Sequence, residues 1–295
     1  MLATYPRSLY LTGSLLALSM AATALPGLLV PGFYEPFLTR YGLAYAQVFM
    51  QDLATVLLLP ILAWSMLAAR RGSARGVAVW GGVCVYALYY YSFYGFDKLY
   101  TPLYPLYLAV MGLGAWSLVG LLAGTDAKAF AALADARLPV RFCAAVLAVP
   151  LLFVPIWLSM LFAGIAAKKA APAATVFPLD LCFLIPAAAW AAAALWRRKP
   201  IGYLAGGILL VKAVISGVVL AGGTLYQLLA GERANPGELA LYLVLALPGA
   251  AALGLFLKRL GPAEKGAAPG AAAPGATPPA APGTATHGAS APGAR

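Results

Sequence analysis

Apolar stretches long enough to cross a membrane recur along most of this chain. Each holds about 20 residues with few or no charges, which as a helix would cover the ~30 Å hydrocarbon layer of a bilayer. The stretches are continuously apolar and lack the alternation of a lipid-facing β-barrel. Only 10% of the 295 residues are charged, against about a quarter in soluble domains. The sequence therefore predicts an all-α, polytopic transmembrane helix bundle.

Eight membrane spans are predicted, and the basic residues between them test this count. The spans cover residues 9–30, 45–68, 77–97, 103–123, 142–163, 177–196, 201–224 and 237–257. Alternate connecting segments carry 14 and 5 lysines and arginines, and one lysine remains inside a span. Under the positive-inside rule, this bias predicts a multi-pass protein of the cell inner (plasma) membrane with both termini in the cytoplasm. Cleavage of the first span as a signal peptide is the alternative, and it would leave seven spans.

The two halves of the predicted bundle resemble each other. Residues 51–82, "QDLATVLLLPILAWSMLAARRGSARGVAVWGG", compare with residues 179–207, "LDLCFLIPAAAWAAAALWRRKPIGYLAGG". Each has Asp-Leu, then a proline, then paired arginines and then Gly-Gly. We predict two tandem four-helix units in parallel, over residues 1–124 and 142–260. The alternative is coincidence in a chain rich in alanine and leucine.

Two segments outside the spans have a different character. Residues 125–141 predict a short interfacial helix that links the two units on the cytoplasmic side, with Thr125 as its N-cap. Residues 261–295 are rich in alanine, proline and glycine, which predicts a disordered cytoplasmic tail.

One family resemblance rests on three features. They are the Asp-Leu pair before a proline in the second span, the Tyr-rich third span, and "WRRKPIGYLAGGILLVK" at 196–212. With these features the chain resembles an uncharacterised group of prokaryotic multi-pass membrane proteins of about eight helices. The resemblance covers most of residues 40–225 and leaves out the tail. It implies a membrane fold and no particular activity.

A lysine lies in the middle of the seventh predicted span, in "GGILLVKAVISGVV" (206–219). Lys212 is about eleven residues from the start of the span, too deep for its side chain to reach the interface. An intramembrane charge costs about 3 kcal/mol on insertion scales, so we expect Lys212 to face the bundle interior. Asp52, Asp97 and Asp180 are the carboxylates that could meet it from the outer half of the membrane.

Two tyrosines extend this predicted site. Tyr86, Tyr90 and Asp97 recur at spacings of four and seven residues, which places them on one helix face. The sequence thus predicts a polar, aromatic-lined substrate site that is open to the outside. Its predicted residues are Lys212, Asp52, Asp180, Asp97, Tyr86 and Tyr90.

Residues for several kinds of chemistry are scarce in this chain. The single histidine, His287, lies in the predicted tail, so zinc hydrolysis, haem ligation and Ser-His catalysis lack their usual group. The cysteines, Cys84, Cys143 and Cys182, lie in or beside separate spans and form no CxxC pair. We therefore predict no catalytic residue, no metal and no cofactor.

Three functions remain open from the sequence. The first is a small-solute or ion-coupled transporter, in which Lys212 binds an anionic group or exchanges a proton with Asp52. The second is a membrane-embedded enzyme that acts on a lipid. The third is a non-catalytic accessory subunit, whose Ala-rich segment 187–194 would pack against a membrane-protein partner.

The expected partners are the lipid bilayer and a small molecule or ion. The net charge of +11 lies mainly in the predicted cytoplasmic loops, where topology and anionic lipid explain it. No nucleic-acid partner is predicted.

Overall fold

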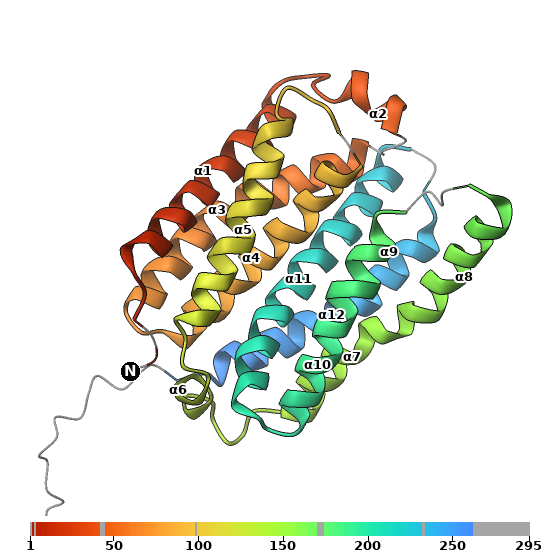
Figure 1. Cartoon of the computed structure of the whole chain (residues 1–295). Coiled ribbons are helices and arrows are strands. Elements are labelled where there is room, and N and C mark those ends of the chain that lie inside the picture. Colours follow the sequence, from red (N-terminus) through yellow and green to blue (C-terminus); the bar gives the residue numbers. More distant parts are fainter. Residues whose placement is uncertain are drawn as a thin grey trace, which may run out of the picture. The chain divides into compact units, whose positions relative to one another are not determined.

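The computed structural model of the chain is a helix bundle (Figure 1). It describes residues 2, 4–41, 45–97, 99–169, 174–231 and 234–261. The elements are α1 (Arg7–Leu29), α2 (Glu35–Tyr41), α3 (Tyr45–Arg70), α4 (Ala74–Phe96), α5 (Tyr104–Ala123), α6 (Ala127–Ala132), α7 (Val140–Ala148), η1 (Val149–Leu152), α8 (Phe153–Ala167), α9 (Val176–Leu179), η2 (Asp180–Leu184), α10 (Ile185–Trp196), α11 (Pro200–Leu229) and α12 (Pro236–Lys258). No strand occurs within these ranges, as the all-α prediction expected. The predicted tail, with His287, lies outside the described residues from position 262 onward.

Seven segments of the described chain are long and apolar enough to cross a membrane. They are Arg7–Leu29, Tyr45–Arg70, Tyr104–Ala123, Val140–Ala167, Val176–Trp196, Pro200–Leu229 and Pro236–Lys258. This is the make-up of a multi-pass membrane protein. The predicted span at 77–97 is not among them, although α4 occupies it with 23 residues, most of them buried. The tyrosines and glycines of α4 lower its mean hydropathy. Most of these residues are buried because α4 packs among other helices.

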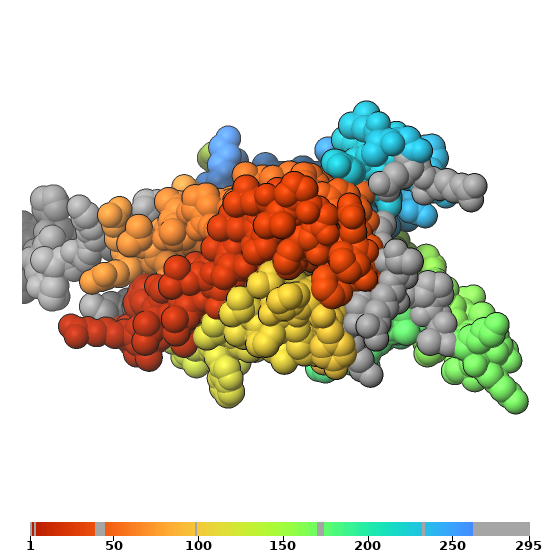
Figure 2. Space-filling model, turned by 90° about the horizontal axis from the view of Figure 1, so that it is seen from above, coloured from red at the N-terminus to blue at the C-terminus, as the bar shows by residue number. Residues whose placement is uncertain are grey.

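Two of the predicted spans are interrupted helices. The span at 142–163 consists of α7, the 3₁₀ turn η1 and α8, because Pro150 and Pro155 lack the N–H that a continuous helix needs. The span at 177–196 consists of α9, the π-helical turn η2 and α10. α8 has no buried residue, and its green atoms stand out at one edge of the molecule in Figure 2.

The long helices form two groups that share one central contact. In the first group, α1, α3, α4 and α5 each pack against two of the others. In the second, α7, α10, α11 and α12 each pack against at least two of the others, and α7 also contacts α11. α11 joins the groups, since it also packs against α3 and α4 (Figure 1). We call the end at which α1 begins and α3, α5, α10 and α12 end the basic end, and the opposite end the far end.

Small residues bring α4 and α11 into direct contact. A Cβ on Gly82 of α4 would overlap the side chain of Val211 on α11. A Cβ on Gly207 of α11 would in turn lie 3.3 Å from Ala78 Cβ. Such close approach is typical of packed transmembrane helices, where dispersion rather than hydrophobic exclusion stabilises the contact.

The linker at the basic end differs from its prediction in one residue. Asp126 caps α6, because its Oδ1 accepts a hydrogen bond from Lys128 N over 2.8 Å. The predicted cap, Thr125, was wrong: its hydroxyl instead lies 2.7 Å from the Tyr5 hydroxyl. Burial raises the pKa of Tyr5 to about 12, so this phenol stays neutral at physiological pH.

The same linker is attached to the end of α12. Arg259 forms an ion pair with Asp135 over 3.1 Å, and Gly261 N donates to Leu133 O over 2.7 Å. The linker between the two groups is therefore held at the basic end by two segments, the one before α1 and the one after α12.

Candidate functional site

Asp180 occupies the first position of the π turn η2 and is 8% exposed. Two aromatic side chains donate to its carboxylate. Tyr89 Oη of α4 donates to Oδ1 over 2.6 Å, and Trp157 Nε1 of α8 donates to Oδ2 over 2.9 Å. A π turn is often found at functional sites, because it shifts the side chains that follow out of helical register. Asp180 is thus held by donors from α4 and α8.

Lys212 lies in α11 and is 5% exposed. Its Nζ is 3.8 Å from the centroid of the Tyr89 ring, which is a cation–π contact. Asp180 is the carboxylate that acts on this ammonium electrostatically, yet no described carboxylate comes within 4.0 Å of it. Tyr89 therefore faces the cation with its ring and the anion with its hydroxyl. We call Lys212, Tyr89, Asp180 and Trp157 the Lys212 cluster.

The lysine has donors to spare. An ammonium carries three N–H donors, and in the described part of the chain no side chain or carbonyl accepts a hydrogen bond from Nζ. These donors are therefore available to a ligand that supplies an acceptor oxygen.

Asp52 is not part of this cluster. It is 1% exposed in α3, and its Oδ2 accepts a hydrogen bond from Tyr34 Oη over 2.9 Å. Gly27 of α1 makes room for it, because a Cβ at that position would overlap Oδ2. Asp52 and Lys212 thus have different partners, since Tyr34 bonds to Asp52 and the Tyr89 ring contacts Lys212.

Replacing Tyr34 by phenylalanine should lower the free energy of unfolding by about 1–3 kcal/mol, because it leaves the buried Asp52 carboxyl without its donor. Thermal unfolding in detergent measures this change. Tyr100→Phe is the control, since Tyr100 is 57% exposed and should tolerate the change. Equal stability of Tyr34→Phe and the wild type would contradict the assigned contact.

The remaining predicted residues lie at different places. Tyr86 is fully buried and bonds to the Thr55 hydroxyl over 2.9 Å, while the Tyr90 ring packs 4.9 Å from the Tyr86 ring. Asp97 ends α4 and accepts a hydrogen bond from Thr175. Of the six predicted residues, the structure places Lys212 and Asp180 in the Lys212 cluster, and the Tyr90 ring lies 5.5 Å from the Tyr89 ring of that cluster.

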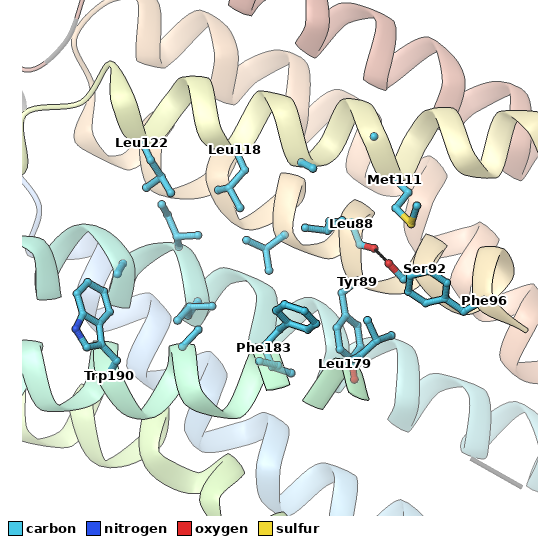
Figure 3. Close-up of a pocket in the computed structure, with 18 residues that line it drawn as sticks. Leu88, Tyr89, Ser92, Phe96, Met111, Leu118, Leu122, Leu179, Phe183 and Trp190 are labelled. Atoms are coloured by element: carbon cyan, nitrogen blue, oxygen red, sulfur yellow. Dashed lines mark hydrogen bonds between the residues drawn. The ribbon is translucent and has the colours of Figure 1, made fainter. Parts of the chain in front are cut away.

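An apolar cavity of about 550 Å³ lies beside Tyr89 (Figure 3). α4 and α5 form one wall, and α9, η2, α10 and α11 form the other. Its lining includes Leu88, Met111, Leu118, Phe183, Trp190 and Leu209. Ser92 adds a hydroxyl, but this donates to Leu88 O over 2.6 Å and leaves the wall apolar. Phe183 and Trp190 are 68% and 55% exposed, so the cavity opens on the outer surface of the bundle. We call it the groove.

The Lys212 cluster lies at the far-end side of the groove. On α11, Ile208 and Leu209 line the groove, and Lys212 follows them by four and three residues on the same helix face. Figure 3 shows Leu122 and Trp190 at one end of the groove and Phe96 at the other, with Tyr89 and Leu179 between them on the Phe96 side. The groove thus passes the polar cluster at Tyr89 and is apolar at both ends.

No protein-family model, curated protein or solved structure matches this chain.

Sequence reasoning missed Tyr89, Trp157 and the groove. Tyr89 lies three residues after Tyr86, a spacing that shares its helix face, but the prediction chose only the four-residue pair Tyr86 and Tyr90. Trp157 lies in an apolar stretch, and nothing in the neighbouring sequence indicates which residue accepts the hydrogen bond from its indole N–H. Ile208 and Leu209 lie on the same face of α11 as Lys212. A helical wheel of this segment could have indicated an apolar surface next to the lysine.

Proposed function

We propose that this chain crosses the membrane eight times: the seven long apolar segments are joined by α4, which is the third span in chain order. We also propose that the two helix groups are tandem four-helix units. In both groups consecutive helices pack and the last packs on the first, and the second group has an additional contact between α7 and α11. α4 and α11, the third helix of each unit, then meet at the centre. The basic end would face the cytoplasm, because most lysines and arginines between spans gather there.

Matching helical hairpins support the duplication. The turn after α3 has Gly72 at φ +80° and the turn after α10 has Arg198 at φ +53°. In each turn the N–H of the following residue donates to the carbonyl five residues earlier, from Ser73 N to Ala68 O and from Lys199 N to Ala194 O.

A glycine occupies the same place in the second helix of both hairpins. A Cβ on Gly76 would lie 2.6 Å from Ala69 N, and one on Gly202 would overlap Leu195 N. The spacing between glycine and contacted nitrogen is seven residues in both cases. Two hairpins that use the same contact at the same spacing favour a repeat over coincidence.

We further propose that the protein is a carrier that binds an anionic ligand at Lys212. One observation carries this proposal: the Lys212 ammonium is buried near the middle of α11 with a tyrosine ring against it and no described acceptor. Ionisable groups inside a membrane mark candidate ligand or ion sites. Asp180 acts on this ammonium from beyond 4.0 Å and so leaves its N–H donors open to a ligand.

The position of the site supports movement of the ligand. Lys212 and Tyr89 lie where α11 meets α4, which is the contact between the proposed units. Transporters built from repeats hold their ligand at such a contact, beside interrupted helices. Here the interrupted helix is the one that carries Asp180 in η2.

Replacing Lys212 by methionine should abolish anion-driven currents. We expect proteoliposomes on a solid-supported membrane to give a transient current on a jump of phosphate, succinate or octanoate. Lys212→Met should lower that current about tenfold or more, since it removes a charge-assisted contact. Lys128→Met, at an exposed position of α6, should leave it unchanged. Equal currents in Lys212→Met and the wild type would contradict the carrier role of Lys212.

A further inference from the structure

The groove and the Lys212 cluster adjoin at Tyr89, the member of the cluster that lines the groove. The α11 stripe that lines the groove, Ala205, Ile208 and Leu209, leads directly to Lys212 one turn further on. On the opposite wall, Asp180 precedes the groove residues Phe183 and Leu184 by three and four positions. An extended molecule in the groove would therefore place one end at the ammonium.

The dimensions of the groove suit a single hydrocarbon chain. On α5 it extends from Met111 to Leu122, which is ~16 Å along a helix and close to the ~15 Å of one leaflet. Small residues, Gly112, Ala115 and Ala187, keep it open along this length. Its volume of about 550 Å³ lies within the range of ligand sites.

The Lys212 cluster beside the groove selects the head group. Each Asp180 oxygen already accepts a hydrogen bond, Oδ1 from Tyr89 and Oδ2 from Trp157. Lys212 has three N–H donors and no described acceptor, so it favours a carboxylate oxygen at the end of the chain.

From this complementarity we propose that the groove binds a single-chain amphiphile with an anionic head, of the long-chain carboxylate class. The hydrocarbon chain lies between α5 and α10, and the carboxylate meets the Lys212 ammonium beside Tyr89. This inference rests on the proposed anion site and names its substrate class.

Glycine substitutions test the groove without disturbing the fold. An added Cβ on Gly112 meets nothing within 4 Å, so a tryptophan there should fill the groove and still fold. Gly254 of α12 also has nothing within 4 Å of an added Cβ and lies away from the groove. Gly254→Trp is therefore a matched control, and Gly112→Leu is a smaller second variant.

The experiment uses the full chain in nanodiscs and a photoreactive diazirine analogue of palmitate. We expect cross-linking to peptides of α5 or α10, suppressed by palmitate but not by methyl palmitate. Gly112→Trp and Lys212→Met should each lower labelling about tenfold or more, and Gly254→Trp should not. Gly112→Leu should give an intermediate loss.

Three outcomes would overturn the inference. They are equal labelling in Gly112→Trp and the wild type, suppression by phosphatidylglycerol as strong as by palmitate, and cross-links outside the groove. If one of these outcomes occurs while Lys212→Met still abolishes the anion currents, the long-chain carboxylate is the wrong ligand class, but the proposed carrier function stands. If Lys212→Met changes neither labelling nor currents, the proposed carrier function fails with it.

Discussion

Replacing Asp180 by alanine should destabilise the protein by about 3–5 kcal/mol, because it leaves the buried Lys212 ammonium without the carboxylate that balances it. The change also removes the acceptor of the Tyr89 hydroxyl and the Trp157 indole N–H. Both donors are then left without their partner at a site that is 8% exposed in the wild type. Thermal unfolding in detergent, followed by tryptophan fluorescence, measures the loss.

A double-mutant cycle separates the charge from the hydrogen bonds. Lys212→Met removes the ammonium, so the double variant Asp180→Ala/Lys212→Met should recover about 1–3 kcal/mol relative to the sum of the single changes. The matched cycle combines Asp52→Ala with Lys212→Met. Asp52 belongs to the other helix group and bonds to Tyr34, so this pair should be additive within about 0.5 kcal/mol.

The two cycles distinguish the structure from the pairing that the sequence suggested. Recovery in the Asp52 cycle and additivity in the Asp180 cycle would show that Lys212 is balanced by Asp52, against the contacts described here.

Replacing Gly202 by leucine should cost about 3 kcal/mol or more. A Cβ at this position would overlap backbone atoms of Ala194 and Leu195 in α10. Side chains can rotate away from an added group, but a backbone in a helical hairpin cannot, so the cost exceeds the usual 1–3 kcal/mol of overpacking. The loss should appear as a lower thermal midpoint and a smaller yield of monodisperse protein in detergent.

Gly254→Leu is the control for this change, since nothing lies within 4 Å of an added Cβ there. It should change stability by less than about 0.5 kcal/mol. Gly202→Ala should lie between the two. A Gly202→Leu variant as stable as Gly254→Leu would mean that α10 and α11 do not approach each other as described.

Much of the fold could be read from apolar length alone. The structure places a helix at every predicted span, because a continuous apolar segment has few alternatives in a membrane. The limits of α10 and α11 follow from Arg197, Arg198 and Pro200, which end one helix and begin the next. The interruption at η2 was not predictable, since a π turn depends on the packing around Asp180 and not on a local signal.

The site was harder to predict than the fold. Helical spacing grouped Tyr86 with Tyr90, and both are buried in α4, but the hydroxyl that reaches Asp180 belongs to Tyr89. Which face of a helix meets which neighbour depends on small residues such as Gly82 and Gly207, whose partners lie far away in the sequence.

By itself the sequence determined that this chain forms apolar helices, where basic residues end them, and that one lysine lies deep inside a span. These properties depend on the cost of placing charge and open backbone in hydrocarbon, which each segment faces alone. Only the tertiary structure decided that Lys212 is balanced by Asp180 through Tyr89, that Asp52 bonds to Tyr34, and that a groove leads to the cluster. Those contacts depend on the rotation and close approach of helices from distant parts of the chain, and no single segment contains that information.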